Sequence, residues 1–204
     1  DHGQELGGNV AITNCRIEGF QSYYLADFNS TSGIGEQALN KVRMKRCYFK
    51  NNQGSIAARG LVGDPMKLCS YTNNKFETTT LDSSFWDYLE ANNALRVVVT
   101  DNIFVGPIDQ QLATGKKGVL QTWSKNPLPW TLNYSGNVIS NMKFGLKIPL
   151  INGFYMPNVS DTDNHKIDLS ATLTNVIHAA SFLYKMNDGS TISSNKYSEG
   201  EFTP

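Results

Sequence analysis

Apolar and polar residues alternate in five short segments of the chain, and each segment continues in the same way. The first and third residues are apolar, a bend pair of Asn, Cys, Asp, Gly or Arg follows, and one more apolar residue comes two positions later. The copies span residues 10–17, 42–49, 69–76, 97–104 and 132–139. Alternation with period two predicts a strand with one buried face. Asn, Asp and Gly tolerate the left-handed backbone of a sharp bend.

The copies recur roughly every 30 residues, and a period of about 20 to 50 residues is typical of repeat architectures. Other apolar stretches lie between the copies, as at 55–58 and 118–123. Each period therefore supplies about three short strands, which is one turn of a parallel β-helix. We predict an all-β solenoid of five to six rungs. An antiparallel β-sandwich also has short alternating strands, but it does not require the same residue class at corresponding positions of five segments.

The chain divides into three parts on this basis. Residues 1–8 are an N-terminal extension, 9–142 hold the rungs, and 143–204 are expected to form an irregular last rung, a capping segment and a polar tail. Repeat arrays need polar caps, and eight residues with three glycines are too few to make one. We expect either further sequence upstream or an open first rung on which the same chain or another chain docks.

Charge narrows the choice of partners. Eighteen basic residues balance eighteen acidic ones, which argues against nucleic acid. No apolar run approaches the roughly 20 residues that span a bilayer. The chain starts at Asp1, as a processed or excised protein would, and we expect an extracellular or cell-surface location.

The three cysteines do not have zinc-ligand spacing. Cys69 shares an apolar column with the first residue of the other copies, and Cys15 and Cys47 share a bend column. Buried free thiols are one interpretation. A disulfide between Cys15 and Cys47 is the other, because neighbouring strands lie about 4.8 Å apart, within the range of disulfide Cα separations.

The copies resemble the coils of the right-handed parallel β-helix superfamily typified by pectate and pectin lyases, over about residues 9–142. The resemblance is one of scaffold, which does not fix function. It implies calcium held by clustered carboxylates and a basic residue that removes a proton. Here the carboxylates are scattered over different phases of the repeat, and no adjacent Asp-Asp pair occurs. We therefore assign no catalytic residue and no cofactor, with Ca²⁺ kept as a weak alternative.

Outward basic and aromatic residues are the remaining candidates, because Lys and Arg bind carboxylated or sulfated glycans. The glycan-binding candidates are Arg16, Arg43, Lys45, Arg46, Tyr48, Arg59 and Lys75. The same cations could also simply prevent aggregation of exposed strands. Two functions follow. The first is a non-catalytic extracellular module of a surface, adhesive or fibre-forming protein that contacts glycans. The second is a lyase or glycoside hydrolase fragment acting on acidic polysaccharide.

Overall fold

The structure is a computed structural model of the whole chain. It describes residues 8–20, 24–29, 40–52, 55–61, 64–79, 87–106, 118–125, 130–142, 144–148, 171–174, 178–185, 191–196 and 200–202. Nearly all of the predicted N-terminal extension and most of the polar part of the C-terminal segment lie outside these residues. Every regular element in the described ranges is a β-strand.

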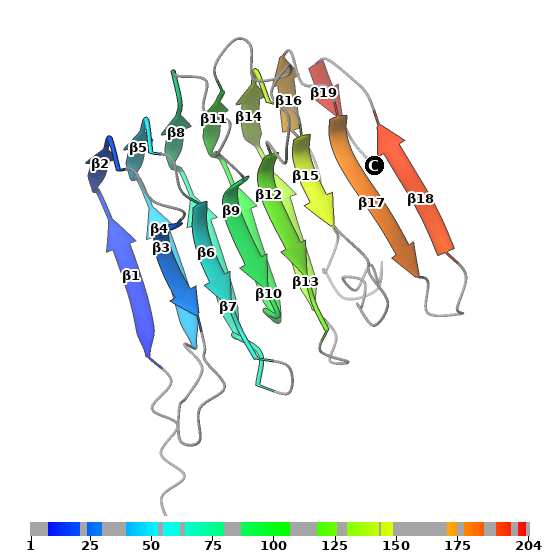
Figure 1. Cartoon of the computed structure of the whole chain (residues 1–204), viewed down its shortest axis with the longest axis horizontal. Coiled ribbons are helices and arrows are strands. Elements are labelled where there is room, and N and C mark those ends of the chain that lie inside the picture. Colours follow the sequence, from blue (N-terminus) through cyan, green and yellow to red (C-terminus); the bar gives the residue numbers. More distant parts are fainter. Residues whose placement is uncertain are drawn as a thin grey trace, which may run out of the picture.

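The strands form three sheets (Figure 1). Sheet A contains, in spatial order, β1 (Asn9–Thr13), β4 (Lys41–Lys45), β7 (Leu68–Thr72), β10 (Arg96–Thr100) and β13 (Thr131–Ser135). Sheet B contains β2 (Arg16–Glu18), β5 (Tyr48–Lys50), β8 (Lys75–Glu77), β11 (Ile103–Val105), β14 (Asn137–Ser140), β16 (Ala171–Thr174) and β19 (Gly200–Phe202). Sheet C contains β3 (Tyr24–Asn29), β6 (Ser55–Arg59), β9 (Asp87–Asn92), β12 (Gly118–Trp123), β15 (Phe144–Ile148), β17 (His178–Lys185) and β18 (Thr191–Lys196).

From β1 to β15, sequential strands go round the three sheets in turn, and each strand pairs in parallel with its equivalent one rung away. This arrangement is a parallel β-helix, as the repeat predicts. At the C-terminal end two strands break the rule, because β18 pairs with β17 and β19 pairs with β16 in antiparallel orientation. Figure 1 shows β18 running opposite to β17 at the red end of the stack.

The observed register superimposes the repeat columns inferred from the sequence. Val10 pairs with Val42, Val42 with Cys69, and Cys69 with Val97. After the bend, the second apolar column stacks aromatic rings in the core. The ring of Phe76 lies 4.7 Å from that of Phe49 and 4.9 Å from that of Phe104, in nearly parallel planes. Such rings bury roughly 150 to 250 Å² each, so this column is a major source of stability.

Asparagines at the second bend position form a hydrogen-bonded ladder between sheets A and B. Asn74 Nδ2 donates to Asn102 Oδ1, and Asn102 Nδ2 to Asn137 Oδ1, both at 3.0 Å. Asn102 Oδ1 also accepts the backbone N–H of Asn74 at 2.9 Å, while its Nδ2 donates to the Tyr71 carbonyl at 2.9 Å. These buried amides are therefore satisfied by neighbouring rungs, which avoids the cost of an unpaired polar group.

Cysteine replaces asparagine in this column on the first two rungs. The Cys47 N–H donates to Asn74 Oδ1 at 3.0 Å, and Cys47 Sγ lies 3.6 Å from the Ile12 carbonyl oxygen. Cys15, Cys47 and Cys69 are all free thiols in the structure. Complete burial raises the pKa of Cys69 to about 12.

The first bend position has a left-handed backbone on every rung. The φ angles are 55° at Asn14, 56° at Arg46, 55° at Asn73, 57° at Asp101 and 64° at Gly136. Asn, Asp and Gly adopt this conformation readily. Arginine does not, so Arg46 occupies a position that its side chain disfavours.

The first rung is less covered than the later ones. Val10, Ile12 and Ile17 are only half-buried, whereas Val42 and Phe49, which stack on the first and last of them, are buried. Within the described residues, β1, β2 and β3 each pair on one side only. Docking of a chain on this rung remains a prediction.

Candidate functional site

The seven glycan-binding candidates lie on three different outer faces. Arg43 and Lys45 are on β4 in sheet A, and Arg46 is in the bend that follows. Tyr48 is on sheet B, in one column with the residues at positions 16 and 75. Arg59 ends β6 in sheet C. No single face gathers all seven, so each face is treated as a separate site.

On sheet B, Tyr48 is held between two cations. It is the register partner of Arg16 on one side and Lys75 on the other. The Arg16 guanidinium carbon and Lys75 Nζ each lie 5.1 Å from the centre of the Tyr48 ring. Cations at this distance are attracted to the negative face of an aromatic ring. The Tyr48 ring therefore has a cation near it from each neighbouring rung, and a sugar that stacks on the ring would compete with them.

Carboxylates in the adjacent column neutralise the sheet B cations. Glu18 Oε2 lies 2.8 Å from Arg16 Nη2, and Glu18 Oε1 lies 3.6 Å from Lys50 Nζ. Glu77 Oε2 lies 2.6 Å from Lys75 Nζ. The acid stands two residues after its cation on the same strand, where both side chains point outward. On the outer face of these three rungs, two carboxylates thus pair with three cations, which leaves one net positive charge.

The same contacts set the acidity of Glu77. The Lys75 ammonium lowers the pKa of the Glu77 carboxyl below its ordinary value, and the hydrogen bond from Tyr48 Oη, at 2.9 Å, adds to the effect. The carboxylate consequently stays ionised to a lower pH than an ordinary glutamate does. Further along the column of Tyr48 and Lys75, Ile103 and Val138 are exposed apolar residues.

On sheet A, four cations lie in a row along a single rung. We call them the basic strip, and they are Lys41, Arg43, Lys45 and Arg46. The first three alternate with the buried residues of β4, so they share the outer face, with Lys41 half-buried and the others exposed. Strand geometry puts Lys41 and Lys45 about 13 Å apart at Cα. Lys41 was not among the candidates inferred from the sequence, although its alternation with Val42 already marks it as outward.

Among the described residues, no carboxylate pairs with the basic strip. None of its four side chains makes an ion pair or a hydrogen bond with any residue in the described ranges. On neighbouring rungs the outward positions are small and neutral, as at Ala11, Thr13, Ser70 and Thr72. In the bend column, Asp101 lies two rungs from Arg46, which is about 10 Å of backbone spacing.

On sheet C, Arg59 is paired. Its Nη2 lies 2.7 Å from Glu90 Oε2, and the two side chains are 23% and 11% exposed. Arg59 and Asn92 are register partners on adjacent rungs. The close approach of the chain beyond Arg59 depends on Gly60, where a Cβ would lie 2.3 Å from the Asn93 carbonyl oxygen.

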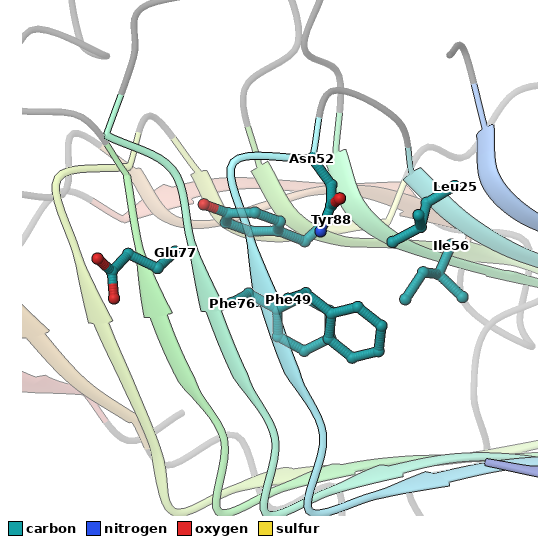
Figure 2. A pocket seen from close by; sticks show the side chains of 7 residues that line it. All are labelled: Leu25, Phe49, Asn52, Ile56, Phe76, Glu77 and Tyr88. Carbon is teal, nitrogen blue, oxygen red and sulfur yellow. The ribbon is translucent and has the colours of Figure 1, made fainter. Parts of the chain in front are cut away.

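A small cavity lies inside the solenoid rather than on a wall. Figure 2 shows the residues that line it: Leu25, Phe49, Asn52, Ile56, Phe76, Glu77 and Tyr88. Its volume is about 10 Å³, which is room for at most one water. In Figure 2 the Glu77 carboxylate points away from the aromatic rings. The cavity is too small to hold a sugar.

Within the described residues, no three His, Cys, Asp or Glu side chains come together as a metal site would require. Among those same residues, no helix is long and apolar enough to cross a membrane. No family model, curated protein or solved structure matches the chain. The class that the geometry defines is therefore a parallel β-helix with three chemically different outer faces.

Proposed function

We propose that this chain is a non-catalytic, extracellular β-helix module of a surface, adhesive or fibre-forming protein, and that it binds acidic polysaccharide on the basic strip. The observation that carries the proposal is the row of four cations, none of which pairs with a carboxylate in the part of the chain that the structure describes. It supports sheet A, rather than sheet B, as the glycan-binding face.

Uncompensated like charges are unfavourable, and a bound anion relieves them. Outward neighbours on a strand stand about 7 Å apart, where two like charges in water repel by about 0.6 kcal/mol. Carboxylate or sulfate groups spaced along a polymer would replace this repulsion with charge-assisted hydrogen bonds, and the planar forks of Arg43 and Arg46 suit both groups. The balanced charge of the whole chain disfavours nucleic acid as the polyanion.

Membership of the pectate lyase-like superfamily is part of the proposal and is supported by the scaffold. The alternative function is a lyase or hydrolase fragment acting on acidic polysaccharide, for which the half-buried Arg59 and the buried Glu90 are the best-supported groups. Glu90 neutralises Arg59, so this guanidinium is less available to an incoming uronate than Arg43. We therefore favour binding without catalysis, and keep Ca²⁺ only as a weak alternative for such an enzyme.

The experiment applies the full chain to immobilised alginate, pectate and a sulfated glycosaminoglycan. We expect retention that weakens as salt is raised, because screening acts on exposed charges, and no release of products. Unsaturated products absorbing in the ultraviolet would support the lyase alternative. Failure to bind any of the three polymers at low salt would contradict the proposal.

Docking on the open first rung is a separate part of this proposal. The half-buried Val10, Ile12 and Ile17 support it, because apolar residues at an uncovered rung are stabilised by a further strand layer. The partner would be a second copy or another chain. Sedimentation analysis should show concentration-dependent association, and a chain that stays monomeric at high concentration would exclude self-docking.

A further inference from the structure

Charge is distributed unevenly over the outer face of sheet A. Its five strands, β1, β4, β7, β10 and β13, contain four basic residues and neither Asp nor Glu. Three of the four, Lys41, Arg43 and Lys45, lie on β4, and the fourth is Arg96, at the start of β10. Arg46 follows β4 directly in the bend. Positive charge on this sheet is therefore concentrated on one rung.

Along the solenoid axis this charge does not continue from rung to rung. Arg43 has Ala11 and Ser70 as register partners, and Val98 and Asn133 continue the same column. The column at the last residue of each strand holds Thr or Ser on every rung except that of β4. A polymer that ran along the axis in either column would meet one cation, whereas a polymer that ran along β4 would meet all four members of the basic strip.

The basic strip is open to solvent over most of its length. The strands of sheet A run across the long direction of the stack, so β4 defines a line across the solenoid (Figure 1). Arg43, Lys45 and Arg46 are exposed on this line. The side chains beside Arg43, those of Ala11 and Ser70, are short, so they do not screen it from a ligand.

The density of charge on this line indicates which polyanion fits it. Outward neighbours stand about 7 Å apart, so four cations need several anionic groups over a short length of polymer. A polyuronate carries one carboxylate per sugar, whereas a sulfated polysaccharide can carry more than one anionic group per sugar. The guanidinium forks of Arg43 and Arg46 can each make two hydrogen bonds to one such group, and Lys41 and Lys45 act as point charges.

We infer that the basic strip recognises a short, densely sulfated segment of a polysaccharide, and that this segment lies across the solenoid along β4. The inference rests on the proposed function of the strip and specifies its ligand. The distance between the Cα atoms of Lys41 and Lys45, about 13 Å, sets the length of the recognised segment. Sugars beyond this length lie outside the basic strip, so they add little to the affinity.

The test compares two series of oligosaccharides of increasing length, heparin-derived oligosaccharides and oligogalacturonates, by titration calorimetry with the full chain at one ionic strength. At equal length the sulfated series should bind about tenfold tighter or more, which one further charge-assisted hydrogen bond accounts for. Affinity should rise with length until the segment covers the strip and should then stay nearly constant. A steady rise beyond that length would show that the contacts extend along the solenoid, and would overturn the inference.

Two matched variants test the direction of the polymer. Lys41→Gln and Arg96→Gln each remove one positive charge at the first residue of a strand of sheet A, two rungs apart. Lys41→Gln should weaken binding of the sulfated series about five- to tenfold. Arg96→Gln should change it by less than about twofold, because two rungs are about 10 Å, where salt screens the charge. Melting temperatures should be equal for both variants.

The outcomes separate this inference from the proposed function. Equal losses for Lys41→Gln and Arg96→Gln would overturn the placement along β4, and equal affinity for the two series would overturn the preference for sulfate. Either result leaves binding of acidic polysaccharide intact. Binding of neither series would overturn the proposed function and this inference together.

Discussion

The outer faces of sheets A and B are built on the same rungs and joined by the same bends, yet they treat their cations in opposite ways. On β8, Lys75 is followed two residues later by Glu77, and the two form an ion pair. On β4, Arg43 is followed two residues later by Lys45, and neither is paired within the described residues. Outward residues two apart on one strand therefore decide whether a cation is already satisfied or still available to a ligand.

The difference also bears on what each face contributes to stability. Exposed ion pairs such as those of sheet B are worth about 0 to 1 kcal/mol. Within the described residues the basic strip makes no ion pair that would stabilise it, and the left-handed backbone of Arg46, at φ 56°, is itself unfavourable. Features that lower stability without an internal benefit are commonly associated with function.

The outer faces of sheets A and B rest on the same core, so a change in the core affects both. Asn102→Leu should lower the stability of the whole solenoid. The change leaves the N–H and Nδ2 of Asn74 without their acceptor and removes the Nδ2 donor to Asn137 Oδ1, which keeps only the bond from the backbone N–H of residue 102. At about 1 to 3 kcal/mol for each buried group left unpaired, we expect a loss of about 2 to 5 kcal/mol in the free energy of unfolding. Chemical denaturation measures it. Ile103→Val, at an exposed neighbouring position, is the control, and an unchanged melting temperature for Asn102→Leu would exclude a stabilising ladder.

Arg46→Asn tests how much the left-handed Arg46 lowers the free energy of unfolding. Asn suits the left-handed bend, as Asn14 and Asn73 show in the same column. We expect the free energy of unfolding to rise by about 1 kcal/mol and binding to acidic polysaccharide to weaken several-fold. Thermal denaturation and affinity measurements give the two results. A variant that gains stability but keeps full affinity would remove Arg46 from the site.

Sheet B should bind acidic polysaccharide more like sheet A when its two carboxylates are removed. The double change Glu18→Gln and Glu77→Gln leaves Arg16, Lys50 and Lys75 without carboxylate partners. We expect affinity for alginate or a sulfated glycosaminoglycan to rise a few-fold, with a steeper dependence on salt. Unchanged affinity would mean that Glu18 and Glu77 are not the reason why sheet B binds acidic polysaccharide weakly.

The smallest effect concerns pH. Lys75 and Tyr48 hold the pKa of Glu77 below its ordinary value, so its contribution to stability is fully present above about pH 4.3 and is lost as the pH falls through the lowered pKa. For so exposed a pair we expect less than about 1 kcal/mol. Denaturation of the unmodified chain and Glu77→Gln between pH 7 and pH 2 should converge at low pH. A constant difference across the range would show that ionisation of Glu77 does not contribute.

The repeat made most of the scaffold predictable. Alternation at Val97 and Val99, the Asp101-Asn102 bend and Phe104 each recur at the same phase, and the observed register aligns them with their equivalents. A strict period also determines which side chains face outward. The sequence alone therefore predicts that Arg43 and Lys45 lie on the outer face of their strand, as they do in sheet A.

The pairing of charges was harder to foresee. The Lys75-x-Glu77 spacing was visible in the sequence and identifies an ion pair once the strand is known. Arg59 and Glu90 are different, because a linker of variable length separates their strands and their register depends on how that linker folds.

The decisive measurement compares equal charge reversals on the two faces. Arg43→Glu with Lys45→Glu on sheet A should lower affinity for acidic polysaccharide about 10- to 100-fold, as expected when two charge-assisted contacts become repulsive. Arg16→Glu with Lys75→Glu makes the same change in net charge on sheet B and should lower it only a few-fold. If the two double variants lost affinity equally, binding would follow net charge alone, and the basic strip would not be the site.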